Sequence, residues 1–261
     1  MPKFAANLSM LFTEVPFMER FGAAQAAGFT YVEYLFPYDY PAADIKKQLT
    51  AHGLTQVLFN IPSGNWAEGD RGIAAHPGRV DEFRAGVQKA LEYAEVLGVK
   101  QLNCQPGKKA DGYEHAAQWA TLVDNFRYVA GLLQEKGMKL LVEPLNPFDI
   151  PGVFLSRTDQ ALQLIAEVGM PNVFVQYDVY HAQRVEGEIT ATLRRHIGQI
   201  SHIQIADNPG RNQPGTGEIN YPFIFRELDA MGYEGYIGLE YNPKVGSAAS
   251  LDWIESYGYK R

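Results

Sequence analysis

The feature that most constrains the fold of this chain is an eightfold alternation of short β-rich runs with longer runs in which apolar residues recur at helical spacing. Such alternation predicts parallel strands joined by crossover helices. The expected strands are Lys3–Asn7, Tyr31–Phe36, Thr55–Asn60, Val99–Cys104, Lys139–Glu143, Val173–Asp178, Ser201–Ala206 and Tyr236–Tyr241. The expected helices lie near Pro16–Ala27, Ala42–His52, Val80–Leu97, Glu114–Lys136, Thr158–Val168, Glu188–Ile197, Pro222–Met231 and Ala248–Tyr257.

Glycines support these boundaries. Gly28, Gly53, Gly98, Gly137 and Gly232 each follow a helical stretch and precede a strand by one to four residues. A left-handed residue that ends a helix is expected at this place, and glycine adopts that conformation most readily. Eight units in 261 residues leave about 33 residues for each, the usual size of a βα repeat in a closed barrel.

An open, doubly wound sheet is the competing architecture. It normally carries a glycine-rich phosphate loop after its first strand, but the segment Asn-Leu-Ser-Met-Leu-Phe at positions 7–12 contains no glycine. We therefore predict a single α/β domain over residues 1–261, a (β/α)8 TIM barrel. Two long loops, 61–78 and 207–217, follow strands in this scheme and should lie at the active face.

The composition narrows the choice of partner. The formal charge of −7 and the pI near 5.4 argue against nucleic acid and anionic membrane surfaces, which attract clustered Lys and Arg. A small molecule is the expected partner. Cys104 is the one cysteine and is expected to be a buried small hydrophobe. With no apolar leader and no run of about 18 apolar residues, the sequence predicts a soluble, cytoplasmic protein. Whether it forms a homo-oligomer is left open.

Four consecutive strands carry a carboxylate or an amide at or near their carboxyl ends. These residues are Glu143, Asp178, Gln204 and Glu240, spaced by 35, 26 and 36 residues. Equivalent positions on the fifth to eighth strands converge at the mouth of a barrel, and three carboxylates gathered there would repel one another. A hard cation resolves the repulsion, and an all-oxygen donor set favours Mg²⁺ or Mn²⁺. The sequence therefore predicts one divalent metal held by these four residues.

Several sequence motifs resemble those of the hydroxypyruvate isomerase family, which belongs to the xylose isomerase-like barrels and includes 2-oxo-tetronate isomerases. The similarity extends over nearly the whole chain. The motifs are Phe-Ala-Ala-Asn-Leu-Ser-Met at 4–10, Val-Glu-Tyr-Leu-Phe-Pro-Tyr at 32–38, Val-Glu-Pro-Leu-Asn at 142–146, Gln-Tyr-Asp-Val-Tyr-His at 176–181, His-Ile-Gln-Ile-Ala at 202–206, Gly-Glu-Ile-Asn-Tyr at 217–221 and Gly-Leu-Glu-Tyr at 238–241.

The resemblance implies a metal-dependent isomerase that interconverts a hydroxy-ketone and a hydroxy-aldehyde through an enediolate. It assigns Glu143 and Glu240 as the acid–base pair as well as metal ligands. It also implies that His181 and Arg211 contact the substrate, and an arginine there can hold a substrate carboxylate with two hydrogen bonds. The substrate stays open between hydroxypyruvate, which would yield tartronate semialdehyde, and a longer 2-oxo-tetronate-type acid.

Two further polar residues lie at or near the ends of the first two expected strands, namely Asn7 and Glu33. We expect both at the same mouth, where each either binds the substrate or has a structural role. His202 lies two residues before Gln204 and should share its inward face, one layer deeper in the barrel. His181 is expected in the loop after the sixth strand.

Three alternatives use the same barrel. A ketose 3-epimerase would use the same two glutamates, but such enzymes usually have a histidine where this chain has Gln204. A phosphodiesterase of the endonuclease IV type needs several metals with many histidine ligands, and only His181 and His202 lie near the expected site. A non-catalytic sugar-acid-binding barrel would be expected to have lost one of the paired glutamates, and both are present.

Overall fold

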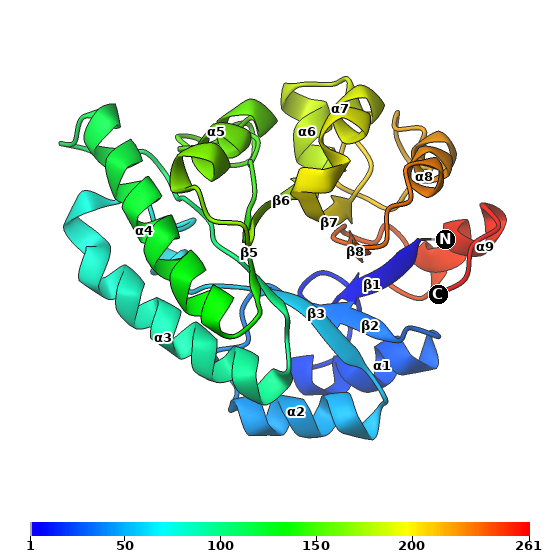
Figure 1. Cartoon of the computed structure of the whole chain (residues 1–261). Helices are drawn as coiled ribbons and strands as arrows, with labels where there is room; N and C mark the ends of the chain where they lie inside the picture. The colour runs from blue at the N-terminus through cyan, green and yellow to red at the C-terminus, as the bar shows by residue number, and fades with distance from the viewer. Residues whose placement is uncertain (1) are drawn as a thin grey trace.

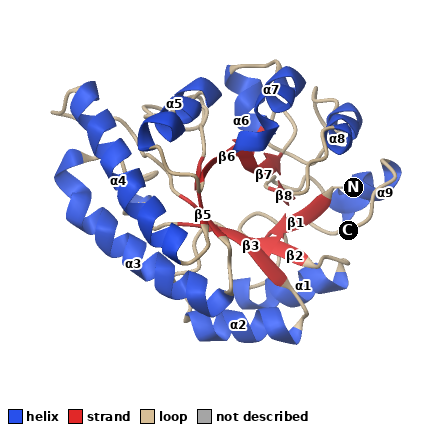
Figure 2. Ribbon diagram, in the orientation of Figure 1, coloured by secondary structure: helices blue, strands red, loops and turns tan. Residues whose placement is uncertain are grey.

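The computed structural model describes residues 2–261 and shows a closed barrel of eight parallel strands in the order β1 to β8, with helices around its outside (Figure 1 and Figure 2). The predicted (β/α)8 TIM barrel is therefore confirmed. The strands are β1 Lys3–Asn7, β2 Tyr31–Glu33, β3 Thr55–Asn60, β4 Gln101–Asn103, β5 Lys139–Val142, β6 Val173–Asp178, β7 Ile200–Ile205 and β8 Tyr236–Leu239.

Nine α-helices lie within the described part of the chain, together with five short 3-10 helices. The α-helices are α1 Arg20–Ala26, α2 Ala42–Ala51, α3 Val80–Leu97, α4 His115–Glu135, α5 Thr158–Val168, α6 Val179–Val185, α7 Ile189–His196, α8 Tyr221–Ala230 and α9 Asp252–Ser256. The 3-10 helices are η1 Phe17–Glu19, η2 Trp66–Glu68, η3 Pro77–Arg79, η4 Ile197–Gln199 and η5 Ala249–Leu251. None of these helices combines the length and the apolar character needed to span a bilayer.

Helix α6 was not predicted, and its presence corrects the expected position of His181. That residue lies in the first turn of α6, directly after β6, and not in a loop. The side chain of Asp178 accepts a hydrogen bond from the backbone N–H of Tyr180 at 2.8 Å and so caps the helix. Because a cap satisfies one of the backbone donors at a helix start, one residue both ends the strand and begins the helix.

Strand β4 is shorter than the predicted Val99–Cys104. At its start, the N–H of Val99 donates to the carbonyl of Ala94 and so belongs to the turn that ends α3. Gly98 forms that turn with a φ of 80°, in the left-handed region. All five glycines predicted to end helices have positive φ, between 62° and 93°.

The barrel interior contains buried polar side chains as well as apolar ones. Ala5, Val57, Leu58 and Leu141 form a small apolar cluster of their own, whereas the larger core packs between the strands and the surrounding helices. Cys104 is buried in that larger core, as expected, and burial raises the pKa of its thiol. The site that the sequence predicts lies at the carboxyl ends of the strands, on a rigid and closely packed support.

Gly238 provides a first test of this interior packing. A Cβ atom at this position would overlap the buried carboxylate of Glu33. We therefore expect Gly238→Ala to lower the free energy of unfolding by about 1–3 kcal/mol, measured by urea denaturation. As a control, Gly131→Ala in α4 has open space around it and should raise stability by about 0.5–1 kcal/mol. Equal stability of Gly238→Ala and the unsubstituted protein would contradict the packing described here.

Candidate active site

Every strand of the barrel carries one buried polar residue at or next to its carboxyl end. Each of these eight residues is at most 5% exposed. The residues, from β1 to β8, are Asn7, Glu33, Asn60, Asn103, Glu143, Asp178, Gln204 and Glu240. The structure thus brings all four predicted metal ligands to one mouth of the barrel, together with Asn7 and Glu33.

Glu143 and Asp178 of this set form a close group with His181, which lies in the first turn of α6. Each offers one possible ligand atom, and these three atoms all lie within 4.8 Å of one another. Glu240 is linked to the group by Arg211, whose Nη2 donates to Glu240 Oε2 at 2.7 Å and lies 3.4 Å from Asp178 Oδ2. Arg211 is thus an ion-pair partner of two predicted metal ligands.

Burial and like charges raise the pKa of both glutamates. For Glu143 the main cause is burial, followed by the charges of Glu240 and Asp178. For Glu240 burial again comes first and raises the pKa to about 8, while the positive charge of Arg211 opposes the shift. The cluster therefore contains more acidic groups than its single arginine can neutralise.

This donor set fits a divalent cation. Its carboxylate oxygens are hard ligands of the kind that Mg²⁺ and Mn²⁺ prefer, and a cation would offset the cost of burying ionised carboxylates next to one another. The neighbouring carboxylates of Glu143 and Asp178 can therefore contribute to holding a metal ion.

His181 has a defined tautomer, which limits its role. Its Nδ1 lies 3.2 Å from the backbone N–H of Asn146 and 2.6 Å from the Nδ2 of the same residue, so two donors face this ring nitrogen. Nδ1 is therefore the acceptor and Nε2 carries the proton. Burial lowers the pKa of His181 to about 4, which keeps the ring neutral near pH 7. In this form Nε2 is a hydrogen-bond donor, 3.5 Å from Asp178 Oδ2, and not a metal ligand.

Asn146 is one of the site residues that were not singled out from the sequence. The Asp149 carboxylate accepts a hydrogen bond from Asn146 Nδ2 at 3.0 Å and another from the Tyr180 hydroxyl at 2.8 Å. Arg184 also pairs with Asp149. This group lies outside the strand ends, and no pattern in the sequence indicates that the chain after β5 would meet α6.

Asn103 was also missed, although a signal for it existed. Its Nδ2 donates to Glu143 Oε2 at 2.9 Å and so fixes one oxygen of a predicted catalytic group. Asn103 ends β4 just as Asn7 and Asn60 end their strands, so considering the ends of all eight strands would have identified it.

Asn7 and Glu33 were predicted to bind the substrate or to have a structural role. In the structure, Asn7 Nδ2 donates to Glu33 Oε1 at 3.0 Å, and Gln204 Nε2 donates to the same oxygen at 2.7 Å. His202, one layer deeper as expected, places Nε2 2.7 Å from Glu33 Oε2, although without the alignment of a hydrogen bond. Glu33 therefore lies at the centre of a buried polar network beneath the acidic cluster, which consists of Glu143, Asp178 and Glu240.

The loop after β7 carries Arg211 and is held from within by Asp207. The buried Asp207 carboxylate accepts hydrogen bonds from the backbone N–H groups of residues 208, 215, 216, 217 and 219. Arg211 itself has a φ of 54°, in the left-handed region. The Cζ atom of its guanidinium lies over the Tyr180 ring, 5.2 Å from the ring centre. Its Nε is buried without a protein partner, so one donor of the guanidinium is free for a ligand.

Comparison with known proteins agrees with this geometry. The family model of the xylose isomerase-like TIM barrel matches residues 21–257. Hydroxypyruvate isomerase of Escherichia coli is 49% identical over 257 residues, which cover 98% of this chain and 100% of that protein. The chain belongs to the hydroxypyruvate isomerase family. It is an enzyme, an isomerase of the aldose–ketose type.

Two other members of this comparison show how the family varies. The 2-oxo-tetronate isomerase of Cupriavidus necator is 46% identical over 98% of this chain and 99% of its own length. A crystal structure from Brucella melitensis, described as an AP endonuclease of family 2, is 47% identical, covers 98% of this chain and 99% of its own, and has a TM-score of 0.96. Of the described histidines, only His181 and His202 lie at the polar centre, which does not fit the histidine-rich multimetal site of a nuclease.

The raised pKa of Glu240 predicts how stability depends on pH. Its usual value is near 4.5 and its folded value about 8, so between these the folded state retains a proton that the unfolded state has released. The free energy of unfolding of the metal-free enzyme should therefore fall as pH rises from 6.5 to 8, because in this range the proton that folded Glu240 retains outweighs the partial proton that His181 binds only when unfolded.

Thermal unfolding of the metal-free enzyme at several pH values tests this expectation. The midpoint should be lower at pH 8 than at pH 6.5, and Glu240→Gln should reduce the difference because the amide does not titrate. Saturating Mn²⁺ should also reduce it, since a cation stabilises the ionised carboxylates. A midpoint that rises with pH in the metal-free enzyme would contradict the assignment.

Proposed function

We propose that this enzyme isomerises a small hydroxy-keto acid, either hydroxypyruvate to tartronate semialdehyde or a longer 2-oxo-tetronate-type acid. The observation that carries the proposal is the buried group of Glu143, Asp178 and Glu240 beside Arg211 and a neutral His181. The names of the E. coli and C. necator relatives support the two candidate substrates. We propose that the enzyme acts in the cytoplasm and has no nucleic-acid or membrane partner. Its assembly into a homo-oligomer is left open.

The chemistry requires moving a proton between two adjacent carbons. One glutamate of the pair Glu143 and Glu240 removes the proton from the carbon that bears the hydroxyl, which gives an enediolate. The same or the other glutamate then delivers a proton to the former carbonyl carbon, and the proton of the original hydroxyl passes to the former carbonyl oxygen. The raised pKa of each glutamate suits it to accept and return a proton near neutral pH. Asn103 holds one oxygen of Glu143 and leaves the other free.

His181 and Arg211 have complementary parts in substrate binding. The Nε2–H of His181 can donate to a substrate oxygen on which negative charge develops, as an uncharged imidazole does in other isomerisations. Arg211 has a free Nε next to an Nη2 that pairs with Glu240, and this edge suits a carboxylate. We propose Arg211 as the group that recognises the acid end of the substrate.

The proposed cofactor is one Mg²⁺ or Mn²⁺ ion held by Glu143, Asp178, Gln204 and Glu240. When bound, such an ion stabilises negative charge on the carbonyl and hydroxyl oxygens of the substrate. Asp178 has two further contacts, because it caps α6 and faces Arg211. These contacts fix its carboxylate before any ligand binds.

Proton NMR in D2O tests the function directly. The protein is stripped of metal, supplied with Mg²⁺ or Mn²⁺ and incubated separately with hydroxypyruvate, 2-oxo-tetronate and a free ketose. Metal-dependent formation of the positional isomer with deuterium at the exchanging carbons supports the proposal and ranks the acids. Formation of an epimer from the ketose alone would favour the 3-epimerase, and no exchange with any compound would refute the isomerase.

Glu240→Gln separates proton transfer from binding. We expect the variant to fold and to keep part of its metal affinity, because the amide retains an oxygen donor. Turnover should fall by at least about 10²-fold, since an amide cannot accept and return a proton. Turnover and the Mn²⁺ dissociation constant are measured on the same preparation, and near-normal turnover would remove Glu240 from the mechanism.

Arg211→Lys tests recognition of the acid end. A lysine keeps the positive charge but loses the paired N–H groups, so KM should rise by about 10-fold or more while the thermal midpoint changes little. The matched control is Arg194→Lys in α7, an exposed arginine that pairs with Glu227 on the outer helices. An unchanged KM in Arg211→Lys would leave carboxylate binding to another residue.

A further inference from the structure

A directed chain of hydrogen bonds runs beneath the acidic cluster. The backbone N–H of Ser9 donates to Asn7 Oδ1 at 3.0 Å, which leaves Asn7 Nδ2 as the donor to Glu33 Oε1 at 3.0 Å. Gln204 Nε2 donates to the same Glu33 oxygen at 2.7 Å. The direction of the Asn7 bond therefore follows from a backbone N–H, which can only donate, and that of the Gln204 bond follows from the carboxylate of Glu33, which accepts.

Glu33 is enclosed on every side by protein. It is 1% exposed, and its second oxygen lies 2.7 Å from His202 Nε2. On the side of β8 only a glycine fits, because a Cβ atom at Gly238 would overlap the carboxylate. Both oxygens of Glu33 thus face protein groups, and such an enclosed carboxylate is poorly placed to contact a substrate.

A glutamine side chain has two ends of similar shape and opposite hydrogen-bonding character. A carboxylate only accepts hydrogen bonds, so Glu33 selects the NH2 end of Gln204. The carbonyl end then lies on the other side, where it accepts a hydrogen bond from Gln176 Nε2 at 2.6 Å and retains a second lone pair. Gln204 is also the register partner of Asp178, the neighbouring predicted ligand on β6.

We propose that Asn7 and Glu33 are positioning residues that orient the Gln204 amide so that its oxygen, and not its nitrogen, is available to a divalent cation. This inference rests on the proposed metal-dependent function. It replaces the expectation of substrate contact for Asn7 and Glu33 with an indirect role through Gln204. Groups that orient a ligating side chain commonly change metal affinity by about 10–100-fold when removed.

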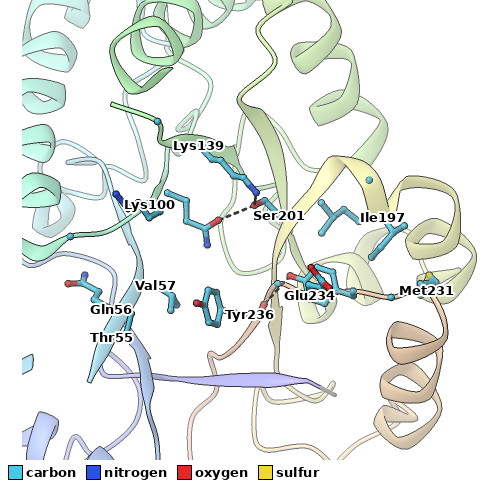
Figure 3. A pocket seen from close by; sticks show the side chains of 18 residues that line it. Thr55, Gln56, Val57, Lys100, Lys139, Ile197, Ser201, Met231, Glu234 and Tyr236 are labelled. Carbon is cyan, nitrogen blue, oxygen red and sulfur yellow. Dashed lines mark hydrogen bonds between the residues drawn. The ribbon is translucent and has the colours of Figure 1, made fainter. Parts of the chain in front are cut away.

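The network continues downward and supplies a matched control. Gln101 Nε2 lies 3.4 Å from His202 Nδ1, and the Ser201 hydroxyl donates to Gln101 Oε1 at 3.1 Å. Lys139 Nζ donates to Ser201 Oγ at 3.0 Å, at a cavity of about 550 Å³ on the amino-terminal side of the barrel (Figure 3). Lys139 reaches Glu33 only through three intervening side chains, so Lys139→Met should leave the Gln204 amide in place.

The experiment measures Mn²⁺ affinity of the full-length protein by calorimetry, without substrate. Glu33→Met, which removes the acceptor at similar size, should weaken Mn²⁺ binding by about 10–100-fold. Glu33→Gln can still present an oxygen to Asn7 and Gln204, so its affinity should stay closer to that of the wild type. Lys139→Met should bind Mn²⁺ as the wild type does. Circular dichroism at the same temperature confirms that each variant is folded.

A second background distinguishes orientation from general support of the fold. A glutamate at position 204 has two equivalent oxygens and needs no acceptor to orient it, and it would face the like charge of Glu33. In Gln204→Glu, adding Glu33→Met should therefore leave Mn²⁺ affinity unchanged or raise it. A merely structural role of Glu33 predicts a loss of affinity in both backgrounds.

The outcomes separate this inference from the function on which it rests. A loss of Mn²⁺ affinity on Glu33→Met in the wild-type background, with no loss in the Gln204→Glu background, supports it. Wild-type Mn²⁺ affinity in Glu33→Met, or an equal loss in both backgrounds, overturns the orienting role and leaves the isomerase untouched. A wild-type protein that binds no Mn²⁺ overturns the metal site together with this inference.

Discussion

Repulsion among buried carboxylates is the constraint around which the upper half of this barrel is organised. Glu143, Asp178 and Glu240 lie together at the mouth, and burial and mutual charge raise the pKa of both glutamates. Arg211 is the cation in contact with two of them. A fold can retain such a cluster only if the surrounding structure is stable without it, and the apolar core between strands and helices provides that stability.

Two side chains in the site are chemically ambiguous, and neighbours resolve both ambiguities. An imidazole can carry its proton on either nitrogen, and Asn146 directs two donors at Nδ1 of His181. An amide can present either end, and Glu33 accepts from the nitrogen of Gln204. In each case the deciding group lies outside the acidic cluster itself. Residues outside the acidic cluster therefore set the orientation of both groups.

Much of the site could be predicted because parallel strands place their carboxyl ends at a common edge. The positions of four polar residues at strand ends were sufficient to predict that Glu143, Asp178, Gln204 and Glu240 lie at one mouth of the barrel. Asn103 follows from the same rule applied to one more strand. Asn146 and Asp149 do not, because their contacts with α6 arise from the path of a loop, and a loop path depends on packing that has no periodic signal.

The sequence by itself determined the barrel, its repeat length and the strands that carry the acidic residues, because these follow from periodicity and from local preferences such as the left-handed glycines. The tertiary structure alone decided which atoms face one another. It extended β6 directly into α6 and so placed His181 in a helix, and it enclosed Glu33 between Asn7, Gln204 and His202. Hydrogen-bond direction and pKa depend on distances between residues far apart in the chain, and such distances exist only once the barrel is closed.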